Sequence, residues 1–425
     1  MKKFTLLILS LFIFKCTQVD QESRSLFQPD EDNGGLTLPQ GFGATVFADT
    51  LGRARHIAVH ENGDVFINLR SLKNGKGLVA LRDSDNDGHA EEIEYFGNAA
   101  GTGIGIYQNF LYYSTDSTVY RVGLSPNSLV PNEKSELIIS DLLNKRQHAA
   151  KSFTFDEAGY IYVNVGAPAN ACQEQMRTPG SVGMDPCPLL ENSGGIWRFQ
   201  AGKPDQKQME DGYRFSTGIR NAVAINYNPY SKHVYIVQHG RDQLYQFFPE
   251  YYSQEQSAEL PAEEFFMLRD GADFGWPYCY YDHLIHKKVL APEYGGDGED
   301  VGRCAEKDDP IMAFPGHWGP NALLFYTGDM FPEKYKNGAF IAFHGSWNRA
   351  PEQKGYHVIF VPFDGELPSG DYEVFASGFP GVETIESPAD AKFRATGLAQ
   401  GPDGSIYVTD DNVGRVWKIF YSGQD

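Results

Sequence analysis

The side chains in this sequence that are best suited to chemistry recur at matching positions, each beside a predicted pair of β-strands. They are Arg55, His148, the pair Arg220 and Asn221, the run His239, Gly240, Arg241 and Asp242, the run from His344 to Arg349 with Trp347 and Asn348, and the pair Lys392 and Arg394. Arginine binds carboxylates through two parallel hydrogen bonds. In a chain of net charge −20, such a cluster predicts a small ligand with several negative charges. A structural ion pair is the alternative for any one arginine alone, but the shared position favours a common site.

His148 is the candidate general base. Imidazole titrates near neutral pH, and proton transfer by a positioned side chain contributes about 10²- to 10⁴-fold to a rate. The alternative is a histidine that caps a strand through a hydrogen bond. Trp347 is the candidate to lie against a flat ring of the ligand.

One repeated unit positions these residues. Within residues 148–166, polar and apolar residues alternate from Ser152 to Phe155, a turn follows, and an aromatic and β-branched run from Tyr160 to Val165 completes a predicted β-hairpin. The unit recurs at residues 54–70, 103–122, 220–247, 321–349 and 396–421. Six units that are each too small to bury their own hydrophobic face predict an all-β fold, a six-bladed β-propeller. We expect residues 38–47 to pair near the last hairpin and so close the ring.

The composition excludes a nucleic-acid partner. The 425 residues contain 36 Lys and Arg against 56 Asp and Glu, without a basic cluster that could bind a phosphate backbone. The sequence also lacks the helix-based motifs GxGxxG, the P-loop, G-x-S-x-G and HExxH. Any cofactor must therefore be held by loop side chains that converge from several repeats.

The N-terminal residues predict export. Residues 1–15 have a basic start and an apolar stretch that is too short to span a bilayer, which is typical of a signal peptide. Cys16 follows directly, as in a bacterial lipoprotein that is acylated at this residue; secretion with Cys16 removed or free is the alternative. Residues 16–37 are polar and acidic and predict a flexible tether, so that the propeller occupies residues 38–425.

The other four cysteines favour two disulfides, because export places them in an oxidising compartment. Each neighbouring pair brackets a loop, so the natural pairing is Cys172 with Cys187 and Cys279 with Cys304. A zinc site is the weaker alternative, since no CxxC motif supports it. The pairs lie within long insertions at residues 167–195 and 248–319, which we expect to wall a central pocket.

An acidic segment after residue 82 has the spacing of a calcium-binding loop. Asp83, Asp85, Asp87, Gly88 and Glu94 match the pattern D-x-D-x-D-G followed by an acidic residue at the twelfth place. Both flanks are predicted strands, whereas an EF-hand needs helices. The segment is therefore either a structural calcium site or an acidic turn with Gly88 in the left-handed conformation.

At these residues the sequence resembles the soluble quinoprotein sugar dehydrogenases, which depend on pyrroloquinoline quinone (PQQ), and especially their L-sorbosone dehydrogenase-like branch. The resemblance covers roughly residues 38–421. It rests on the motifs RQHAAKSFTFDEAGYIYVNVGAPANAC, GIRNAVAINYNP, VQHGRDQLYQF, FGWPYCYYD, FHGSWNR and GPDGSIYVTDD. The family is a six-bladed propeller with PQQ on its axial face, in agreement with the number of repeated hairpins.

The resemblance implies a role for each candidate residue. His148 would be the catalytic base that takes the proton of the sugar C1 hydroxyl, and Arg220, paired with Asn221, would polarise the reacting quinone carbonyl. The residues expected to contact PQQ are Arg55, Arg220, Asn221, His344, Trp347, Asn348, Arg349, Lys392 and Arg394. Backbone oxygens of Gly240 and Arg241 would bind an axial calcium ion. Gln147 replaces the acidic residue of the glucose-type enzymes, so their sugar contacts do not transfer.

These features predict a PQQ- and calcium-dependent dehydrogenase that oxidises a sugar or a related alcohol or aldehyde. It would be exported to the periplasm or held at the outer membrane through lipid on Cys16, and would pass electrons to a periplasmic cytochrome or quinone. A non-catalytic carbohydrate-binding or scaffolding propeller is the first alternative. A lactonase-like hydrolase is the second, but its axial calcium needs inward Asp, Asn and Glu side chains, whereas this set is richer in Arg and His.

Overall fold

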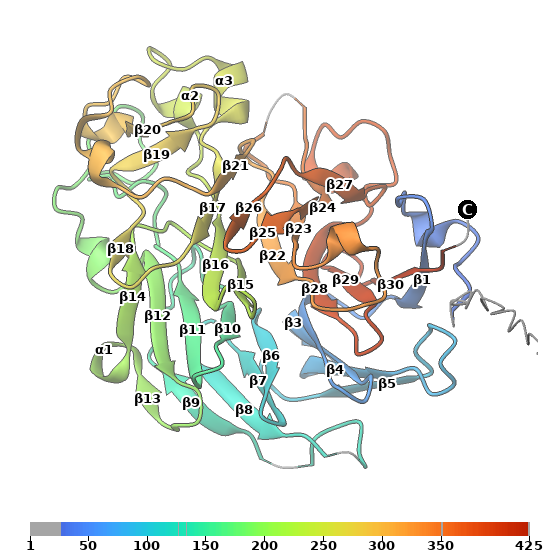
Figure 1. The fold of residues 1–425 in the computed structure, drawn as a ribbon. Coiled ribbons are helices and arrows are strands. Elements are labelled where there is room, and N and C mark those ends of the chain that lie inside the picture. The colour runs from blue at the N-terminus through green and yellow to red at the C-terminus, as the bar shows by residue number, and fades with distance from the viewer. Residues whose placement is uncertain (1–26, 126, 133, 350–351, 424–425) are drawn as a thin grey trace, which may run out of the picture.

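The hairpins predicted from the sequence lie in six β-sheets that surround one axis (Figure 1). The computed structural model describes residues 27–125, 127–132, 134–349 and 352–423. Each sheet is one blade with four antiparallel strands, ordered from the axis outward.

The first three blades follow the chain from the end of the first strand. Blade one consists of β2 (Ala54–Val59), β3 (Val65–Lys73), β4 (Lys76–Arg82) and β5 (Glu92–Phe96). Blade two consists of β6 (Ile104–Tyr107), β7 (Phe110–Ser114), β8 (Val119–Gly123) and β9 (Glu136–Ser140), with β13 (Gln206–Lys207) parallel at its edge. Blade three consists of β10 (Phe153–Phe155), β11 (Tyr160–Val165), β12 (Gly195–Gln200) and β14 (Tyr213–Thr217), with β18 (Ala272–Asp273) parallel at its edge.

The last three blades complete the circle. Blade four consists of β15 (Ala224–Asn228), β16 (His233–Gln238), β17 (Glu263–Met267) and β21 (Met312–Phe314). Blade five consists of β22 (Pro320–Phe325), β23 (Ala339–His344), β24 (Tyr356–Val361) and β27 (Glu373–Ala376). Blade six consists of β28 (Ala395–Gln400), β29 (Ile406–Asp410), β30 (Val416–Tyr421) and β1 (Phe42–Ala48).

The remaining elements are short. Two small hairpins are β19 (Cys279–Asp282) with β20 (Lys287–Leu290), and β25 (Phe363–Asp364) with β26 (Leu367–Pro368). The α-helices are α1 (Gln208–Asp211), α2 (Leu244–Phe247) and α3 (Gln254–Glu259). Single 3₁₀ turns occupy Asn33–Gly35, Pro188–Glu191, Pro292–Tyr294, Gly302–Glu306, Glu333–Tyr335 and Pro388–Asp390. No helix in the described ranges is long and apolar enough to cross a membrane.

The ring is closed as the sequence predicts. The inner strands β2, β6, β10, β15, β22 and β28 contact one another in this order, and β28 contacts β2. The first strand, β1, pairs antiparallel with the last strand, β30, from Phe42 opposite Tyr421 onward. Pairing the two ends of the chain in one blade leaves no open gap in the circle of blades. The predicted all-β six-bladed propeller is confirmed.

Apolar residues on both faces of the middle strands fill the space between blades. In β23, every residue from Ala339 to Phe343 is buried. Between blades five and six, the fully buried Trp417 packs edge-on against Phe379 and Phe393. A strand that is covered on both faces needs consecutive apolar residues rather than strict alternation. This packing holds the axial ends of the strands, which carry the site, in a rigid frame.

The propeller begins earlier than residue 38. Phe27 and Leu36 are buried, the Asp30 carboxylate accepts a hydrogen bond from Val46 N at 2.8 Å, and the Asn33 side chain accepts one from Ala44 N at 3.0 Å. Residues 27–37 are therefore fixed against β1, although their polar, acidic sequence predicts a flexible tether. The predicted signal peptide, Cys16 and the rest of the tether lie outside the described residues.

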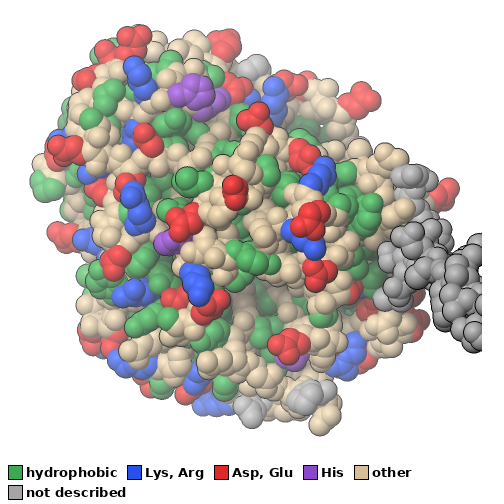
Figure 2. Space-filling model, viewed as in Figure 1, with side chains coloured by type: hydrophobic (Ala, Val, Ile, Leu, Met, Phe, Trp, Pro, Cys, Tyr) green, Lys and Arg blue, Asp and Glu red, His purple; other side chains and the backbone are tan. Residues whose placement is uncertain are grey.

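Both predicted disulfides are present, Cys172 with Cys187 and Cys279 with Cys304. The loops that they close touch each other, because Gly183 N donates to Glu293 O at 2.8 Å. The second insertion is less continuous than predicted: within residues 248–319, β17 and β21 belong to blade four and β18 extends blade three. The α2, α3, β19 and β20 elements gather at one end of the molecule (Figure 1). On the face in Figure 2, acidic and basic side chains are interspersed and form no basic patch.

Acid is expected to destabilise the fold through His357 in β24. Its ring packs edge-on against Trp318, with centroids 4.7 Å apart, and burial lowers its pKa from 6.5 to about 4. Between these pH values the unfolded chain binds a proton that the folded chain does not, so stability falls as the pH falls from 6.5 to 4. Urea unfolding measures how far the free energy of unfolding falls between pH 7 and pH 5. This fall should be ~2 kcal/mol smaller in His357→Phe than in the wild type. Equal losses in the two proteins would contradict this.

Candidate functional site

A cavity of about 360 Å³ lies at the end of the propeller axis where the inner strands begin. Ten predicted residues line it: Arg55, His148, Arg220, His239, Gly240, Asp242, His344, Trp347, Asn348 and Arg394. They belong to blades one, three, four, five and six or to the loops next to them. The structure thus brings together residues that are up to 339 positions apart in the sequence, and their roles in binding remain predictions.

β-Bulges shape the axial ends of three inner strands. The strand register shifts between Ala54 and Ile57 in β2, between Pro320 and Ala322 in β22, and between Ala395 and Gly397 in β28. A bulge leaves a residue out of the ladder and turns its side chain to a new direction. In the first two strands the residues left out include Arg55 and Asn321, which both line the cavity.

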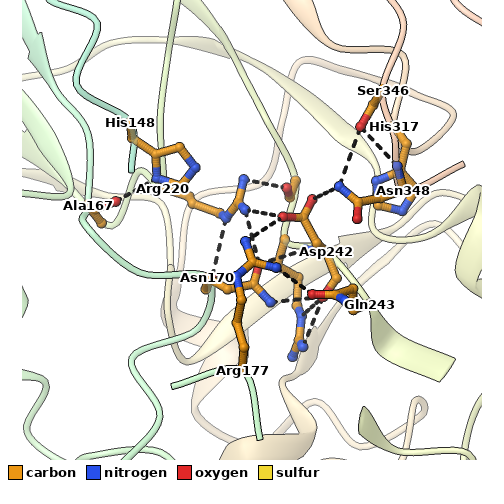
Figure 3. A network of polar contacts seen from close by, with 12 residues as sticks. His148, Ala167, Asn170, Arg177, Arg220, Asp242, Gln243, His317, Ser346 and Asn348 are labelled. Atoms are coloured by element: carbon orange, nitrogen blue, oxygen red, sulfur yellow. Dashed lines mark hydrogen bonds and ion pairs between the residues drawn. The ribbon is translucent and has the colours of Figure 1, made fainter. Parts of the chain in front are cut away.

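Arg220 is held in place by every part of its guanidinium group (Figure 3). It is 3% exposed; Nη2 donates to Asn170 Oδ1 at 3.0 Å and to Asp242 Oδ2 at 2.8 Å, and Nη1 donates to Gly240 O at 2.8 Å. Burial lowers the pKa of Arg220, while the charge of Asp242 acts against this. Because the pKa of a guanidinium group is ordinarily above 12, Arg220 stays charged at neutral pH.

Asp242 connects three side chains around the cavity. Its Oδ2 accepts from Arg220 and, at 3.1 Å, from Arg177 of the first disulfide loop, and its Oδ1 accepts from Asn348 Nδ2 at 2.8 Å (Figure 3). Burial opposes the charged carboxylate, but the positive charges of Arg220 and its neighbours outweigh burial and lower the pKa of Asp242. Asp242 is thus one carboxylate shared by two guanidinium groups.

His148 presents an unprotonated nitrogen to the cavity. Its Nδ1 lies 2.5 Å from Ala167 O (Figure 3), and a carbonyl oxygen only accepts, so Nδ1 carries the proton and Nε2 is an acceptor. Burial and the nearby positive charge of Arg220 lower its pKa to about 3. The imidazole is therefore neutral at physiological pH, which is the form that a general base requires.

Asp411 pairs with two other residues of the cavity lining. Its Oδ2 pairs with Arg55 Nη1 at 2.9 Å and its Oδ1 with His344 Nε2 at 2.8 Å. Arg394 donates instead to the carbonyl oxygens of His344 and Gly345, each at 3.0 Å, and is in ion-pair contact with no described carboxylate. Arg55 Nε is buried without a hydrogen-bond partner in the described chain. Both arginines thus keep binding capacity for an anion.

Four of the residues predicted for the axial site do not line the cavity. Asn221 is buried and its Oδ1 accepts from Asn164 Nδ2 at 3.0 Å, and Lys392 is exposed with its ammonium over the Phe393 ring. Arg241 is buried and pairs with Glu293. Arg349 donates to Ala258 O at 2.6 Å and Gly316 O at 2.9 Å and pairs with Glu259. The structure therefore places the polar groups of Arg349, Lys392 and Asn221 outside the cavity lining, and their direct contact with the ligand stays a prediction.

Several residues of the cavity lining are not among those predicted from the sequence. Glu263, His317, Asn321 and Asp411 also line the cavity, and Arg177 reaches Asp242 from outside it. Glu263 is 2% exposed and accepts from Gly240 N at 2.8 Å and Gly319 N at 3.1 Å, and burial raises its pKa to about 7. The pair Glu263 and Glu264, directly before the apolar residues Phe265 and Phe266, was the available signal. Asp411 stood at the end of the last quoted motif, GPDGSIYVTDD.

Neither candidate calcium position agrees fully with its prediction. Gly240 O accepts from Arg220 Nη1 at 2.8 Å, so a metal ion on this oxygen would stand beside a positive charge, with Asp242 and Glu263 as the compensating carboxylates. In the acidic loop, Asp83, Asp85 and Asp87 gather with Glu91 rather than Glu94. Glu94 lies within β5 opposite Ala80, because a strand rather than a helix follows the loop. The loop itself joins strands β4 and β5, as expected.

The fold and this cavity define a six-bladed propeller with an axial site of arginine and histidine side chains. The chain belongs to the TrAA12-like family, which matches residues 36–422. It is 24% identical over 229 residues to a pyrroloquinoline quinone-dependent pyranose dehydrogenase of Coprinopsis cinerea, covering 48% of this chain and 30% of that protein. It is 22% identical over 285 residues to an aldose sugar dehydrogenase of Escherichia coli, covering 65% of this chain and 61% of that protein.

A fuller match is to a protein of unassigned function. An uncharacterised protein of Borreliella burgdorferi is 23% identical over 409 residues and covers 92% of each chain. Among solved structures, the holo form of the PQQ domain of the Coprinopsis cinerea pyranose dehydrogenase has a TM-score of 0.73 at 18% identity and covers 91% of this chain and 97% of that chain. A calcium structure of the Trichoderma reesei family AA12 protein has a TM-score of 0.74 at 17% identity, with the same coverage. These likenesses establish the shared fold.

Proposed function

We propose that the protein is a PQQ-dependent oxidoreductase that oxidises a sugar, or a related alcohol or aldehyde, in the axial cavity. The observation that carries the proposal is a neutral histidine with a free Nε2 next to the buried, charged Arg220, in a cavity that also holds Arg55 and Arg394. The family membership and the names of the pyranose and aldose dehydrogenases support the same chemistry.

The residues present fit a flat, anionic cofactor. Four arginines and three carboxylates line the cavity, so positive side chains outnumber negative ones there in a chain of net charge −20. Arg55 Nε lacks a partner among described residues, and Arg394 is held by carbonyl oxygens alone, so both offer donors for carboxylates. Trp347, 69% exposed at the cavity, offers a ring face. PQQ, when bound, supplies the acceptor for a hydride.

Residues of the chain would take up the substrate proton, stabilise the developing negative charge and bind calcium. His148 takes the proton of the substrate hydroxyl on Nε2, while its Nδ1 stays bonded to Ala167 O and fixes the ring. Arg220, held by Asn170 and Asp242, places a charge where negative charge develops. Gly240 and Arg241 would offer backbone oxygen to calcium, with Asp242 and Glu263 as the nearby negative charge.

Export to the periplasm is part of the proposal. Two disulfides in the described chain are typical of an oxidising compartment. Reducing equivalents would pass there to a cytochrome or a quinone. The lipid at Cys16 remains a prediction from the sequence.

Reconstitution tests the proposal. The purified protein is titrated with PQQ and calcium, and dye reduction is measured with a panel of aldopyranoses and L-sorbosone. Saturable binding of PQQ below micromolar concentration, with dye reduction by at least one sugar, is the expected result. Failure to bind micromolar PQQ would favour a carbohydrate-binding or scaffolding propeller.

A further inference from the structure

Asn321 is a polar side chain without a partner inside the axial cavity. It is 4% exposed and lines the cavity beside Arg55, His239 and His344. Its side-chain amide makes no hydrogen bond to another described residue, although it is not sealed from solvent. Polar groups this deeply buried are normally hydrogen-bonded. The accessible space next to this amide is the cavity itself.

The backbone around Asn321 is fixed from two sides. His56 Nε2 lies 2.8 Å from Asn321 O, and His239 Nε2 lies 2.8 Å from Pro320 O. Both carbonyl oxygens accept, so each histidine donates a proton to this short segment. The bulge in β22 takes Asn321 out of pairing with β23. Asn321 is thus unpaired in the strand ladder, while hydrogen bonds fix its own carbonyl and the preceding one. Its backbone is preorganised to present the side chain in one direction.

The chemistry of the amide complements that of its neighbours. Arginines in the cavity suit carboxylates, whereas a primary amide offers a donor and an acceptor to a neutral oxygen. We propose that Asn321 is a ligand-binding residue whose amide hydrogen-bonds a neutral oxygen of the molecule in the axial cavity. This inference rests on the proposed function, which supplies two such oxygens: a hydroxyl of the sugar and a carbonyl of the quinone.

Two substitutions of Asn321 distinguish whether its amide binds the sugar hydroxyl or the quinone carbonyl. Binding of PQQ is titrated by fluorescence quenching without sugar, and KM is then measured for a sugar that the wild type oxidises. Asn321→Ala is expected to weaken one of the two constants about tenfold, the effect of one lost hydrogen bond. Asn321→Asp keeps the acceptor and loses the donor. It should be tolerated if a sugar hydroxyl donates to the residue, and should fail like Asn321→Ala if a quinone carbonyl accepts from it.

The matched control is Asn226→Ala. Asn226 stands on the neighbouring inner strand β15, but it lines the channel at the opposite end of the axis and accepts from Phe325 N at 3.2 Å. This variant should keep both constants within about twofold of the wild type, and thermal unfolding verifies that each variant is folded. If wild-type protein binds PQQ and both Asn321 variants match it in both constants, the inference is wrong. If the wild-type protein binds no PQQ, the proposed function itself is wrong, whatever the Asn321 variants do.

Discussion

Replacing His148 with alanine is expected to lower kcat by about 10²- to 10⁴-fold and to leave the affinity for PQQ within about threefold. The ring is held at Nδ1 by Ala167 O, 2.5 Å away, so its free Nε2 is the acceptor available for a substrate proton. Its neutral form persists at neutral pH because burial and Arg220 lower its pKa to about 3. Dye reduction at saturating sugar gives kcat, and a PQQ titration of the same preparation gives the affinity.

His357→Phe is the matched control for this experiment. His357 is also a histidine with a lowered pKa, but it lies in β24 against Trp318, away from the cavity lining. Its replacement should leave kcat unchanged at pH 7.5. If His148→Ala keeps more than a tenth of the wild-type kcat, another group is the base. If the variant loses affinity for PQQ but keeps its kcat at saturating PQQ, His148 is a binding residue.

The sequence predicted the frame of the molecule because that frame depends on local patterns. Six hairpins, the pairing of the chain ends and both disulfides follow from alternation, turn residues and cysteine spacing. The convergence of the candidate side chains also followed, because residues at equal positions in equal repeats meet at one end of the axis. His148, Arg220 and Arg394 line one cavity for this reason.

Side-chain direction at the strand ends could not be predicted in the same way. Asn348 and Arg349 are neighbours in a loop, yet Asn348 lines the cavity and Arg349 turns away to Ala258 O and Gly316 O. Lys392 and Arg394 precede β28, where the two-residue period of a strand does not yet apply. Glu263 and Asn321 depend on contacts between blades four and five, which no local pattern reveals.

Arg394→Met is expected to weaken PQQ binding about 10- to 100-fold, the effect of losing charged hydrogen bonds to one carboxylate. The Arg394 guanidinium is held by the carbonyl oxygens of His344 and Gly345, and no described carboxylate is in ion-pair contact with it. Its charge is therefore available to an anionic ligand, unlike that of Arg220, which Asp242 already pairs. Methionine keeps much of the apolar volume next to Tyr356, so the loop should stay in place. Fluorescence titration with PQQ measures the change.

Arg349→Met distinguishes a direct contact from a structural one. Arg349 is 3% exposed and is bonded to two carbonyl oxygens and to Glu259 outside the cavity lining, so its loss should lower the midpoint of thermal unfolding. The folded fraction should still bind PQQ within about threefold of the wild type. Because the sequence assigned both arginines to the cofactor and the structure places only Arg394 in the cavity, the two variants should differ at least tenfold in PQQ affinity. Equal losses would mean that Arg349 turns toward the ligand, and an unaffected Arg394→Met would remove this arginine from the anion site.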